Sequence, residues 1–265
     1  MLLTHLVTIA VLQGITEFLP ISSSGHLILL PHLTGWPDLG LVYDVAAHGG
    51  TLIAVVTYFH LELRDMLTHW CKNLVGAPIN VHSRMAWAVL WGTIPVGIIG
   101  LLTHDFIAQH LRHPVIIATT TIVFGIVLLF ADTIGRRVRE TSSLRWSDIA
   151  MVGCAQTLAL IPGTSRSGIT ISAGLALGLT RTAAARFSFL LSVPVIFLAT
   201  GYEMWGLLES PLTIDWAGLT IVVAGAALSA FGCIALFMKM LDRLGMVPFV
   251  LYRLMLGALL LALYL

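Results

Sequence analysis

Two polar segments interrupt apolar stretches of this 265-residue sequence, and both carry side chains suited to phosphate chemistry. In the first segment, Gln13 and Glu17 are four positions apart and therefore lie on one face of a predicted helix. A carboxylate in apolar surroundings costs about 3 kcal/mol unless it is paired, so Glu17 is expected to have a specific role. It could act as a general base, bind a divalent cation together with the amide oxygen of Gln13, or pair with an arginine to stabilise the fold.

Three serines, a glycine and a histidine complete the first segment. Hydroxyls and free N–H groups at the start of a helix bind anions, which makes these residues candidates for holding a phosphate. The anion-binding candidates are Ser22, Ser23, Ser24 and Gly25. His26 stands one turn inside the predicted helix and could serve as nucleophile or proton donor. Capping of the helix by one serine is the simpler alternative.

Arg166 lies in the middle of the second interrupted stretch. Its planar guanidinium matches the oxygens of a phosphate, and a guanidinium in an apolar hairpin is costly without an anionic partner. Permanent pairing with Glu17 is the structural alternative. Glycines nearby would let the backbone approach a ligand closely. The other anion-binding candidates of this segment are Gly163, Thr164, Ser165, Ser167 and Gly168.

A weaker signal lies between the two polar segments. Asp44 and His48 are one helical turn apart, and two glycines follow His48 directly. The small glycines predict that His48 can approach the polar segments. We therefore treat His48 as a possible site residue.

The composition places both segments in a membrane. Apolar residues make up 58% of the chain and charged residues 10%, whereas an average soluble domain has about 25% charged residues. Six apolar stretches are close to the ~20 residues that cross a bilayer. They occupy residues 41–59, 85–103, 115–131, 187–206, 214–238 and 247–265. The net charge of +1 offers no basic face, which argues against a nucleic-acid partner.

Two further apolar stretches, residues 2–33 and 149–179, are broken in the middle by Pro20 and by Pro162. A proline removes a backbone donor and ends a helix, so each stretch is predicted to form a helix, a loop and a second helix. Irregular backbone at membrane depth is tolerated only where protein or a wet cavity surrounds it. Each break is therefore expected to be a re-entrant hairpin or a broken span that lines a site.

Basic residues between the spans predict the orientation of the chain. Arginines and lysines gather in segments 60–84 and 133–145 and before the last span, and we expect these parts in the cytoplasm. Segments 104–114 and 207–213 hold a single basic residue, Arg112, and are expected outside. Six crossings alternate correctly only if the first hairpin enters from outside and the second from inside. Both termini are then expected outside.

The two halves of the chain are similar to each other. A shift of 143 positions places Gln13, Ser22, Ser24 and Gly25 on Gln156, Ser165, Ser167 and Gly168. Each half holds one hairpin and three spans, and an odd number of crossings inverts the second half relative to the first. We therefore predict an all-α polytopic membrane protein with one membrane domain, built as an inverted-topology repeat. Residues 1–132 form the first repeat, residues 146–265 the second, and residues 133–145 a basic cytoplasmic linker.

At its two polar segments the sequence resembles the undecaprenyl-diphosphate phosphatase family of bacterial membranes, which is also known from bacitracin resistance. The first family motif is Glu or Gln, three residues, Glu, Phe-Leu-Pro, serines and Gly-His, and residues 13–26 read QGITEFLPISSSGH. The second motif is Pro-Gly-x-Ser-Arg-Ser-x-x-Thr, and residues 162–170 read PGTSRSGIT. The resemblance extends over essentially the whole chain.

The resemblance implies an enzyme of the bacterial inner membrane that hydrolyses the terminal phosphate of a C55 isoprenoid diphosphate. This reaction recycles the carrier lipid of cell-wall synthesis. The resemblance also implies that Glu17 helps to hold a divalent cation, Mg²⁺ or Ca²⁺, and that Ser23 and His26 serve in attack or proton transfer. Arg166 would clamp the diphosphate, and Thr170 completes the substrate-binding motif. The family further suggests that the site faces the outer side of the membrane.

Several alternatives stay open. A phosphorylated Ser23 or His26, and direct attack by water activated by Glu17, are both compatible with the sequence. A transporter or flippase for a polyprenyl phosphate lipid is the alternative function, because inverted repeats with paired broken hairpins are typical of transporters. A pure transporter needs no nucleophile, so the residue set favours an enzyme. The chain could also form a homo-oligomer in the bilayer.

Overall fold

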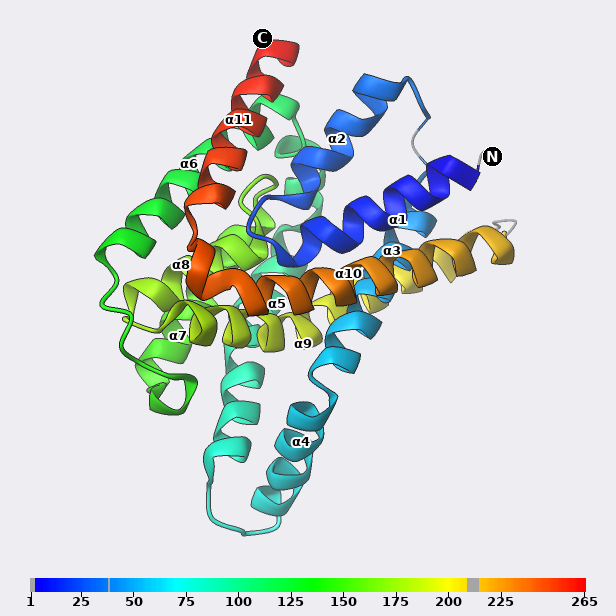
Figure 1. Ribbon diagram of the computed structural model, residues 1–265. Helices are drawn as coiled ribbons and strands as arrows, with labels where there is room; N and C mark the ends of the chain where they lie inside the picture. Colours follow the sequence, from blue (N-terminus) through cyan, green and yellow to red (C-terminus); the bar gives the residue numbers. More distant parts are fainter. Residues whose placement is uncertain (1–2, 38, 209–214) are drawn as a thin grey trace.

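The computed structural model describes residues 3–37, 39–208 and 215–265, and within these ranges the regular elements are helices without strands. The α-helices are α1 (Leu3–Phe18), α2 (Ser23–Thr34), α3 (Leu41–Tyr58), α4 (His60–Leu74), α5 (Val81–His110), α6 (Pro114–Ile134), α7 (Trp146–Thr157), α8 (Arg166–Ala176), α9 (Arg181–Leu208), α10 (Trp216–Leu244) and α11 (Val247–Tyr264) (Figure 1). Two short 3-10 turns are η1 (Thr141–Ser143) and η2 (Leu158–Leu160). The predicted all-α class is confirmed for this part of the chain.

Six of these helices are long and apolar enough to cross a membrane, and each overlaps one of the six predicted spans. They are α3, α5, α6, α9, α10 and α11. The chain is therefore a multi-pass membrane protein, as its composition predicts. Residue 2 of the first predicted hairpin, residue 214 of the fifth predicted span and residues 209–213 of a predicted outer segment lie outside the described residues.

The segment 60–84, which we expected as a loop between spans, contains helix α4. Its apolar residues Leu63, Met66 and Trp70 are spaced by three and four positions and face the hydrophobic core. Its exposed residues include Leu61 and Leu67, but the helix also carries four charged residues, which hide it from a search for apolar spans. Helix α4 packs against α5, and both project together from the lower end of the molecule (Figure 1).

Each of the two interrupted stretches consists of a helix, a break and a second helix. The first break separates α1 from α2, and the second separates η2 from α8. Ser22 and Ser165 stand directly before the second helix of each pair, with φ angles of 73° and 68°. Non-glycine residues rarely adopt this left-handed conformation, and they do so mostly where the surrounding structure holds them.

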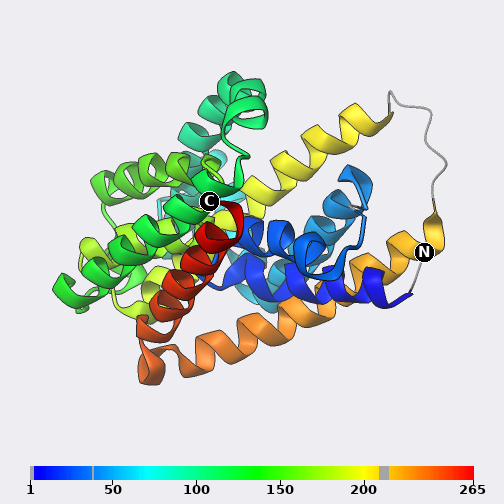
Figure 2. The ribbon, with the colours of Figure 1, turned by 90° about the horizontal axis from the view of Figure 1, so that it is seen from above.

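Long spans surround the two breaks. Helix α10 packs along α1 and α3, and α11 packs along α6 (Figures 1 and 2). Phe18, at the end of α1, meets Phe189 of α9 edge-on with ring centroids 5.3 Å apart, and Phe189 lies 5.7 Å from Phe237 of α10. This aromatic contact fixes the end of α1, and with it the neighbouring Glu17, against α9.

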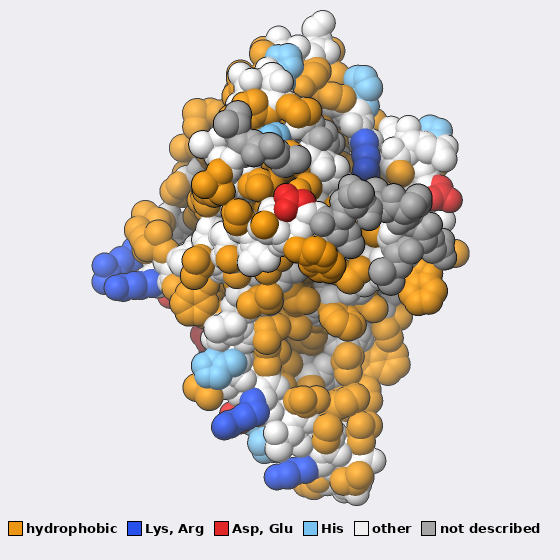
Figure 3. Space-filling model, turned by 90° about the vertical axis from the view of Figure 1, so that its right-hand side faces the viewer, with side chains coloured by type: hydrophobic (Ala, Val, Ile, Leu, Met, Phe, Trp, Pro, Cys, Tyr) orange, Lys and Arg blue, Asp and Glu red, His pale blue; other side chains and the backbone are white. Residues whose placement is uncertain are grey.

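The outer surface matches a lipid environment. Figure 3 shows one face on which hydrophobic side chains cover much of the middle and lower part, whereas the few Lys and Arg side chains lie at its left edge, near its lower end and at one place near the top. Large apolar residues are exposed, including Leu102 at 78% and Leu228 at 77%. A continuous apolar surface of this kind is stable against lipid tails and not against water.

Candidate active site

An ion pair between the two breaks forms the centre of the site. Glu17 lies in the last turn of α1 and Arg166 begins α8, and the Arg166 Nη2 donates to Glu17 Oε1 at 2.9 Å. The two side chains are only 9% and 11% exposed. Arg166 Nη1 also donates to the backbone carbonyl of Ser188 at 3.2 Å. The structure therefore joins the carboxylate of the first polar segment to the guanidinium of the second.

The second oxygen of Glu17 faces Gln13 and His48. Gln13 Nε2 donates to Glu17 Oε2 at 2.9 Å and lies 3.1 Å from His48 Nε2, which is itself 3.7 Å from Glu17 Oε2. The Nδ1 of His48 is 2.8 Å from the carbonyl of Asp44, to which it must donate. The Nε2 of a neutral His48 then accepts from Gln13. The structure thus brings Gln13, Glu17 and His48 together with Arg166, while Gln13 Oε1 is buried without a hydrogen-bond partner among the described residues.

The serines of the two breaks bind across from one break to the other. The backbone N–H of Gly163 donates to Ser24 Oγ at 2.9 Å, and Ser167 Oγ donates to the carbonyl of Leu19 at 3.0 Å. Within each break a similar pair of hydroxyls is in contact, Ser22 with Ser24 at 3.1 Å and Ser165 with Ser167 at 3.2 Å. These bonds make the two breaks one unit.

A cavity of about 580 Å³ opens over this unit. The predicted site residues that line it are Glu17, Ser22, Ser23, Ser24, Gly163, Ser165 and Arg166. The other predicted residues do not line it, namely Gln13, Gly25, His26, His48, Thr164, Ser167 and Thr170. Arg112, on the turn between α5 and α6, adds a second cation to the lining.

The start of α2 is the part of the cavity wall best suited to an anion. No side chain caps this helix, so its first N–H groups stay available for a ligand. Ser23 is the first residue of α2 and lines the cavity, and its hydroxyl makes no side-chain hydrogen bond within the described residues. The start of α8 differs, because Ser165 Oγ accepts from the N–H of Gly168 at 3.2 Å and caps that helix.

His26 points away from the cavity. Its Nδ1 is 2.7 Å from the carbonyl of Ser22, and its Nε2 is 2.6 Å from the hydroxyl of Tyr252 on α11. A carbonyl only accepts, so Nδ1 carries the proton and Nε2 accepts from the tyrosine. In this arrangement both ring nitrogens of His26 are engaged, and the ring holds the backbone of Ser22 in place.

Residues behind the second break fix its shape. Gly163 has φ +93°, and a Cβ built there would lie 2.0 Å from Thr120 Oγ1 and 2.4 Å from the carbonyl oxygen of Ile117, so only glycine fits. Thr170 Oγ1 bonds to the hydroxyl of Ser188 at 2.7 Å, and the carbonyl of Ser188 in turn accepts from Arg166. Thr170 therefore supports Arg166 from behind.

Arg253 of α11 is a residue that the sequence analysis missed. It is fully buried, and its guanidinium donates to the carbonyls of Pro20 at 3.3 Å, Gly163 at 3.0 Å and Thr164 at 2.9 Å. Its Nε donates to the carbonyl of Thr121 at 3.0 Å. One side chain thus ties both breaks together. The signal was present in the sequence, because an arginine inside an apolar span is as unusual as Arg166.

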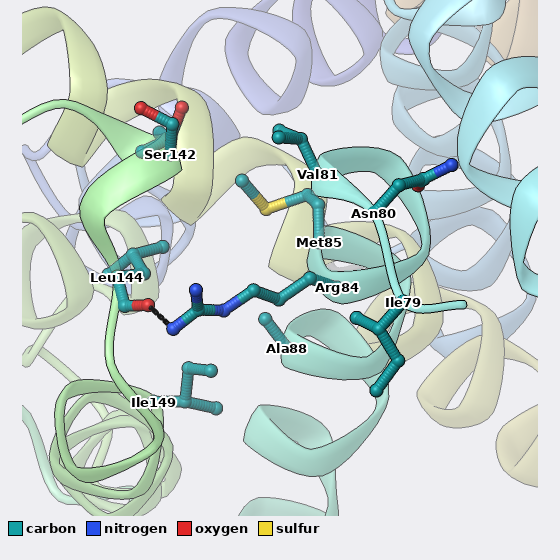
Figure 4. Close-up of a pocket in the computed structure, with 10 residues that line it drawn as sticks. Ile79, Asn80, Val81, Arg84, Met85, Ala88, Ser142, Leu144 and Ile149 are labelled. Carbon is teal, nitrogen blue, oxygen red and sulfur yellow. Dashed lines mark hydrogen bonds between the residues drawn. The ribbon is translucent and has the colours of Figure 1, made fainter.

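A second cavity lies elsewhere and lacks this chemistry. It has a volume of about 270 Å³ and is lined by residues of α5, η1 and α7 and by the segment before α5. Figure 4 shows Arg84 reaching across it to donate to the carbonyl of Leu144. None of the predicted site residues lines it. The residues predicted for phosphate chemistry therefore belong to the cavity that contains Glu17 and Arg166.

The fold and the larger cavity together define a multi-pass membrane protein with a polar cavity lined by Glu17 and Arg166 among its helices. Comparison with known proteins identifies the family. The family model described as "Bacitracin resistance protein BacA" matches residues 6–259. The chain belongs to this family.

Named relatives cover almost the whole chain. The chain is 53% identical over 265 residues to Undecaprenyl-diphosphatase 2 of Stutzerimonas stutzeri, covering 99% of this chain and 98% of that protein. It is 54% identical over 260 residues to Undecaprenyl-diphosphatase of Nitrosococcus oceani, covering 98% of both chains. It is also 54% identical over 257 residues to Undecaprenyl-diphosphatase of Thioalkalivibrio sulfidiphilus, covering 97% of both. The family suggested by the two sequence motifs is confirmed.

Proposed function

We propose that this chain hydrolyses undecaprenyl diphosphate to undecaprenyl phosphate and inorganic phosphate, in the bacterial plasma membrane. The observation that carries the proposal is the Glu17–Arg166 pair in the cavity wall beside the uncapped start of α2. The relatives named undecaprenyl-diphosphatase supply the substrate class. The product lipid is the carrier used again in cell-wall synthesis.

Arg166 and the start of α2 hold the diphosphate. A guanidinium binds two phosphate oxygens at once, and N–H groups at a helix start add donors aimed at the same charge. A phosphate that binds the Arg166 guanidinium displaces Glu17 from it. Glu17 Oε1 is then free to accept a proton, so substrate binding itself prepares the base.

Ser23 is the serine best placed to attack. Its hydroxyl lines the cavity, whereas Ser22, Ser24, Ser165 and Ser167 are already engaged with one another or with backbone groups. In this route Ser23 Oγ bonds to the terminal phosphorus, Glu17 takes the hydroxyl proton, and undecaprenyl phosphate leaves as the P–O–P bond breaks. Water then releases phosphate from the serine. Attack by a water that Glu17 activates gives the same products in one step.

His26 supports this chemistry from behind the cavity wall. Its bond to the Ser22 carbonyl holds the left-handed backbone from which Ser23 begins α2. Direct attack by His26 would require its bond to Tyr252 to break. A direct chemical role for His26 stays a prediction, and the geometry favours a positioning role.

A divalent cation, Mg²⁺ or Ca²⁺, fits this site if the substrate supplies part of its ligands. These cations take oxygen ligands, and Mg²⁺ often binds one or two carboxylates together with substrate phosphates. Glu17 and the unpartnered Oε1 of Gln13 would be the protein oxygens, since no group of three His, Cys, Asp or Glu suited to a metal occurs in the described residues. When bound, the cation would neutralise charge on the diphosphate.

We further propose the inverted repeat of residues 1–132 and 146–265, with two re-entrant hairpins joined by the cytoplasmic linker 133–145. The matching φ angles of Ser22 and Ser165 and the matching hydroxyl pairs support this symmetry. Both termini then lie outside. The cavity faces the same side, because Ile107 and Arg112 near the outer turn between α5 and α6 line it.

Phosphate release tests the function. Purified protein in detergent, given a C55 diphosphate with Mg²⁺ or Ca²⁺, is expected to release inorganic phosphate, and chelation of the cation is expected to stop the reaction. A transporter for the same lipid would move it across a vesicle membrane without releasing phosphate. The uncommitted hydroxyl of Ser23, in the same cavity as Glu17, favours the enzyme, since transport needs no nucleophile.

A further inference from the structure

We propose that an apolar groove between α5 and α9 holds the first part of the isoprenoid tail of the substrate, an inference that rests on the proposed phosphatase function. The groove has a volume of about 350 Å³. Its walls include Val96, Gly97 and Leu101 of α5 and Val195, Leu198 and Ala199 of α9. This volume accommodates the part of the tail nearest the diphosphate, and the rest of the tail extends into lipid.

One face of α5 runs from the groove into the catalytic cavity. Gly97, Gly100 and His104 line the groove, and Ile107 lines the catalytic cavity. Their spacing of three and four positions places all four on one stripe of the helix. A ligand that follows this stripe passes from one space to the other without turning around the helix.

Leu160 marks the boundary between the two spaces. It lines both the groove and the catalytic cavity, and as the last residue of η2 it directly precedes the second break. A Cβ added at Gly100 would lie 3.4 Å from the Leu160 side chain, so α5 and η2 meet at this point. The groove therefore starts beside the residues that hold the diphosphate.

The polarity of the groove fits a lipid tail. Its polar groups gather at one end, where His104 Nε2 lies 3.6 Å from Glu203 Oε1 and the Tyr202 ring meets the His104 ring edge-on. At the other end, the hydroxyl of Thr93 donates to the carbonyl of Val89 at 2.8 Å. Between them the walls are apolar. Leu101 is 68% exposed, which leaves the groove open sideways to the surrounding lipid.

A larger apolar groove elsewhere is the competing location. It has a volume of about 490 Å³, lies between α1, α10 and the start of α11, and includes Leu236 and Gly232. It shares no lining residue with the catalytic cavity. Volume alone would favour this second groove, but a tail covalently joined to the diphosphate must leave from the catalytic cavity. Continuity therefore selects the groove between α5 and α9.

Two matched glycine substitutions test the assignment. A Cβ at Gly97 or at Gly232 meets no atom within 4 Å, so a leucine at either site fills its groove without forcing the backbone apart. Gly97→Leu is expected to lower kcat/KM for a C55 diphosphate by about tenfold or more, as for a crowded apolar pocket. Gly232→Leu is expected to stay within about twofold of the unsubstituted protein. Inorganic diphosphate, which has no tail, should inhibit both variants with an unchanged Ki.

The assignment is wrong if Gly97→Leu leaves kcat/KM unchanged, if Gly232→Leu causes the larger loss, or if the Ki of inorganic diphosphate rises in parallel. A binding experiment keeps the test independent of turnover. A C15 diphosphate with a diazirine on its first isoprene units is expected to label α5 and α9, and labelling confined to α10 would overturn the proposal. Absence of phosphate release by the unsubstituted protein would instead contradict the proposed function and leave the labelling result to decide the groove.

Discussion

The break that leads into α2 and the break that leads into α8 have the same backbone shape but hold different side chains at the same place. Ser22 and Ser165 share a left-handed conformation, and the next residue begins a helix in both cases. That residue is Ser23 at the start of α2 and Arg166 at the start of α8. The same frame thus presents a hydroxyl from one side of the cavity and a guanidinium from the other.

The starts of α2 and α8 also differ in whether a side chain caps the helix. The start of α2 has no side-chain cap and keeps its N–H groups for a ligand, whereas Ser165 caps α8. Nine residues of α8 are buried, including Ser167 and Gly168. This difference supports the proposed division of roles, in which the first break carries the reacting group and the second holds the charge of the substrate. If the two halves are the inverted repeat that we propose, one hairpin was duplicated and its two copies then acquired different polar side chains.

Removal of Arg166 should have the largest effect. Arg166→Ala is expected to lower kcat/KM for phosphate release about a thousandfold or more, in the range known for arginines that stabilise phosphoryl transfer. Arg166→Lys should also fail substantially, because a point charge does not reproduce the bidentate contact.

A second arginine that pairs with a glutamate, but lies at the surface, provides the control. Arg186 pairs with Glu62 at 2.9 Å and is 45% exposed, so Arg186→Ala should retain activity. Both proteins should elute as folded monodisperse peaks in detergent. If Arg166→Ala lost folded protein and activity to the same extent, the Glu17–Arg166 pair would have a structural role only.

Ser23→Ala should have the next largest effect and sharpens the difference between the two breaks. Phosphate release is expected to fall at least about 100-fold if Ser23 is the nucleophile. Ser24→Ala removes the bond to the Gly163 N–H and should cost about tenfold, through poorer positioning. Near-normal turnover by Ser23→Ala would exclude the phosphoserine route and leave water activated by Glu17, or His26, as the attacking group.

Substitution of Arg253 tests the link between the breaks. Arg253→Gln leaves carbonyls of both breaks without their donor, which should reduce the free energy of unfolding by about 3 kcal/mol and turnover by about tenfold. Thermal unfolding in detergent and the phosphate-release rate measure the two effects. A loss of turnover with no loss of thermal stability would indicate that Arg253 contacts the substrate and is not a structural clamp.

Tyr252→Phe should have the smallest effect. It removes one neutral hydrogen bond to His26, worth about 1 kcal/mol, so turnover should fall by no more than about fivefold. The pH profile of kcat should keep its shape. A loss of about 100-fold or a changed pH profile would indicate instead that the tyrosine and His26 transfer a proton during the reaction.

Much of this site could be predicted from the sequence because charged side chains are rare in apolar, membrane-spanning stretches. Glu17 and Arg166 are charged groups in apolar stretches, and their cost predicts both a role and a partner. The same argument would have found Arg253, which stands inside an apolar span. Long apolar runs likewise predict the six spans, whereas α4 is missed because charged residues interrupt its apolar ones.

Side-chain direction could not be predicted in the same way. His26 lies within the family motif, yet its ring turns toward Tyr252, a contact between residues 226 positions apart. The bond from the Gly163 N–H to Ser24 spans 139 positions and depends on how the two breaks are packed. Spacing along a helix predicts a shared face, but only the packed structure decides which hydroxyl stays uncommitted.

The affinity of two variants for the intact substrate tests the division of roles most directly. We suggest measuring the Kd of a C55 diphosphate for Ser23→Ala and for Arg166→Ala in lipid nanodiscs under the same conditions. The account predicts that Ser23→Ala binds within about threefold of the unsubstituted protein, whereas Arg166→Ala binds at least about tenfold more weakly, since a charge-assisted bidentate contact is lost. Equal weakening in both variants, or none in Arg166→Ala, would contradict the assignment of reaction to the first break and grip to the second.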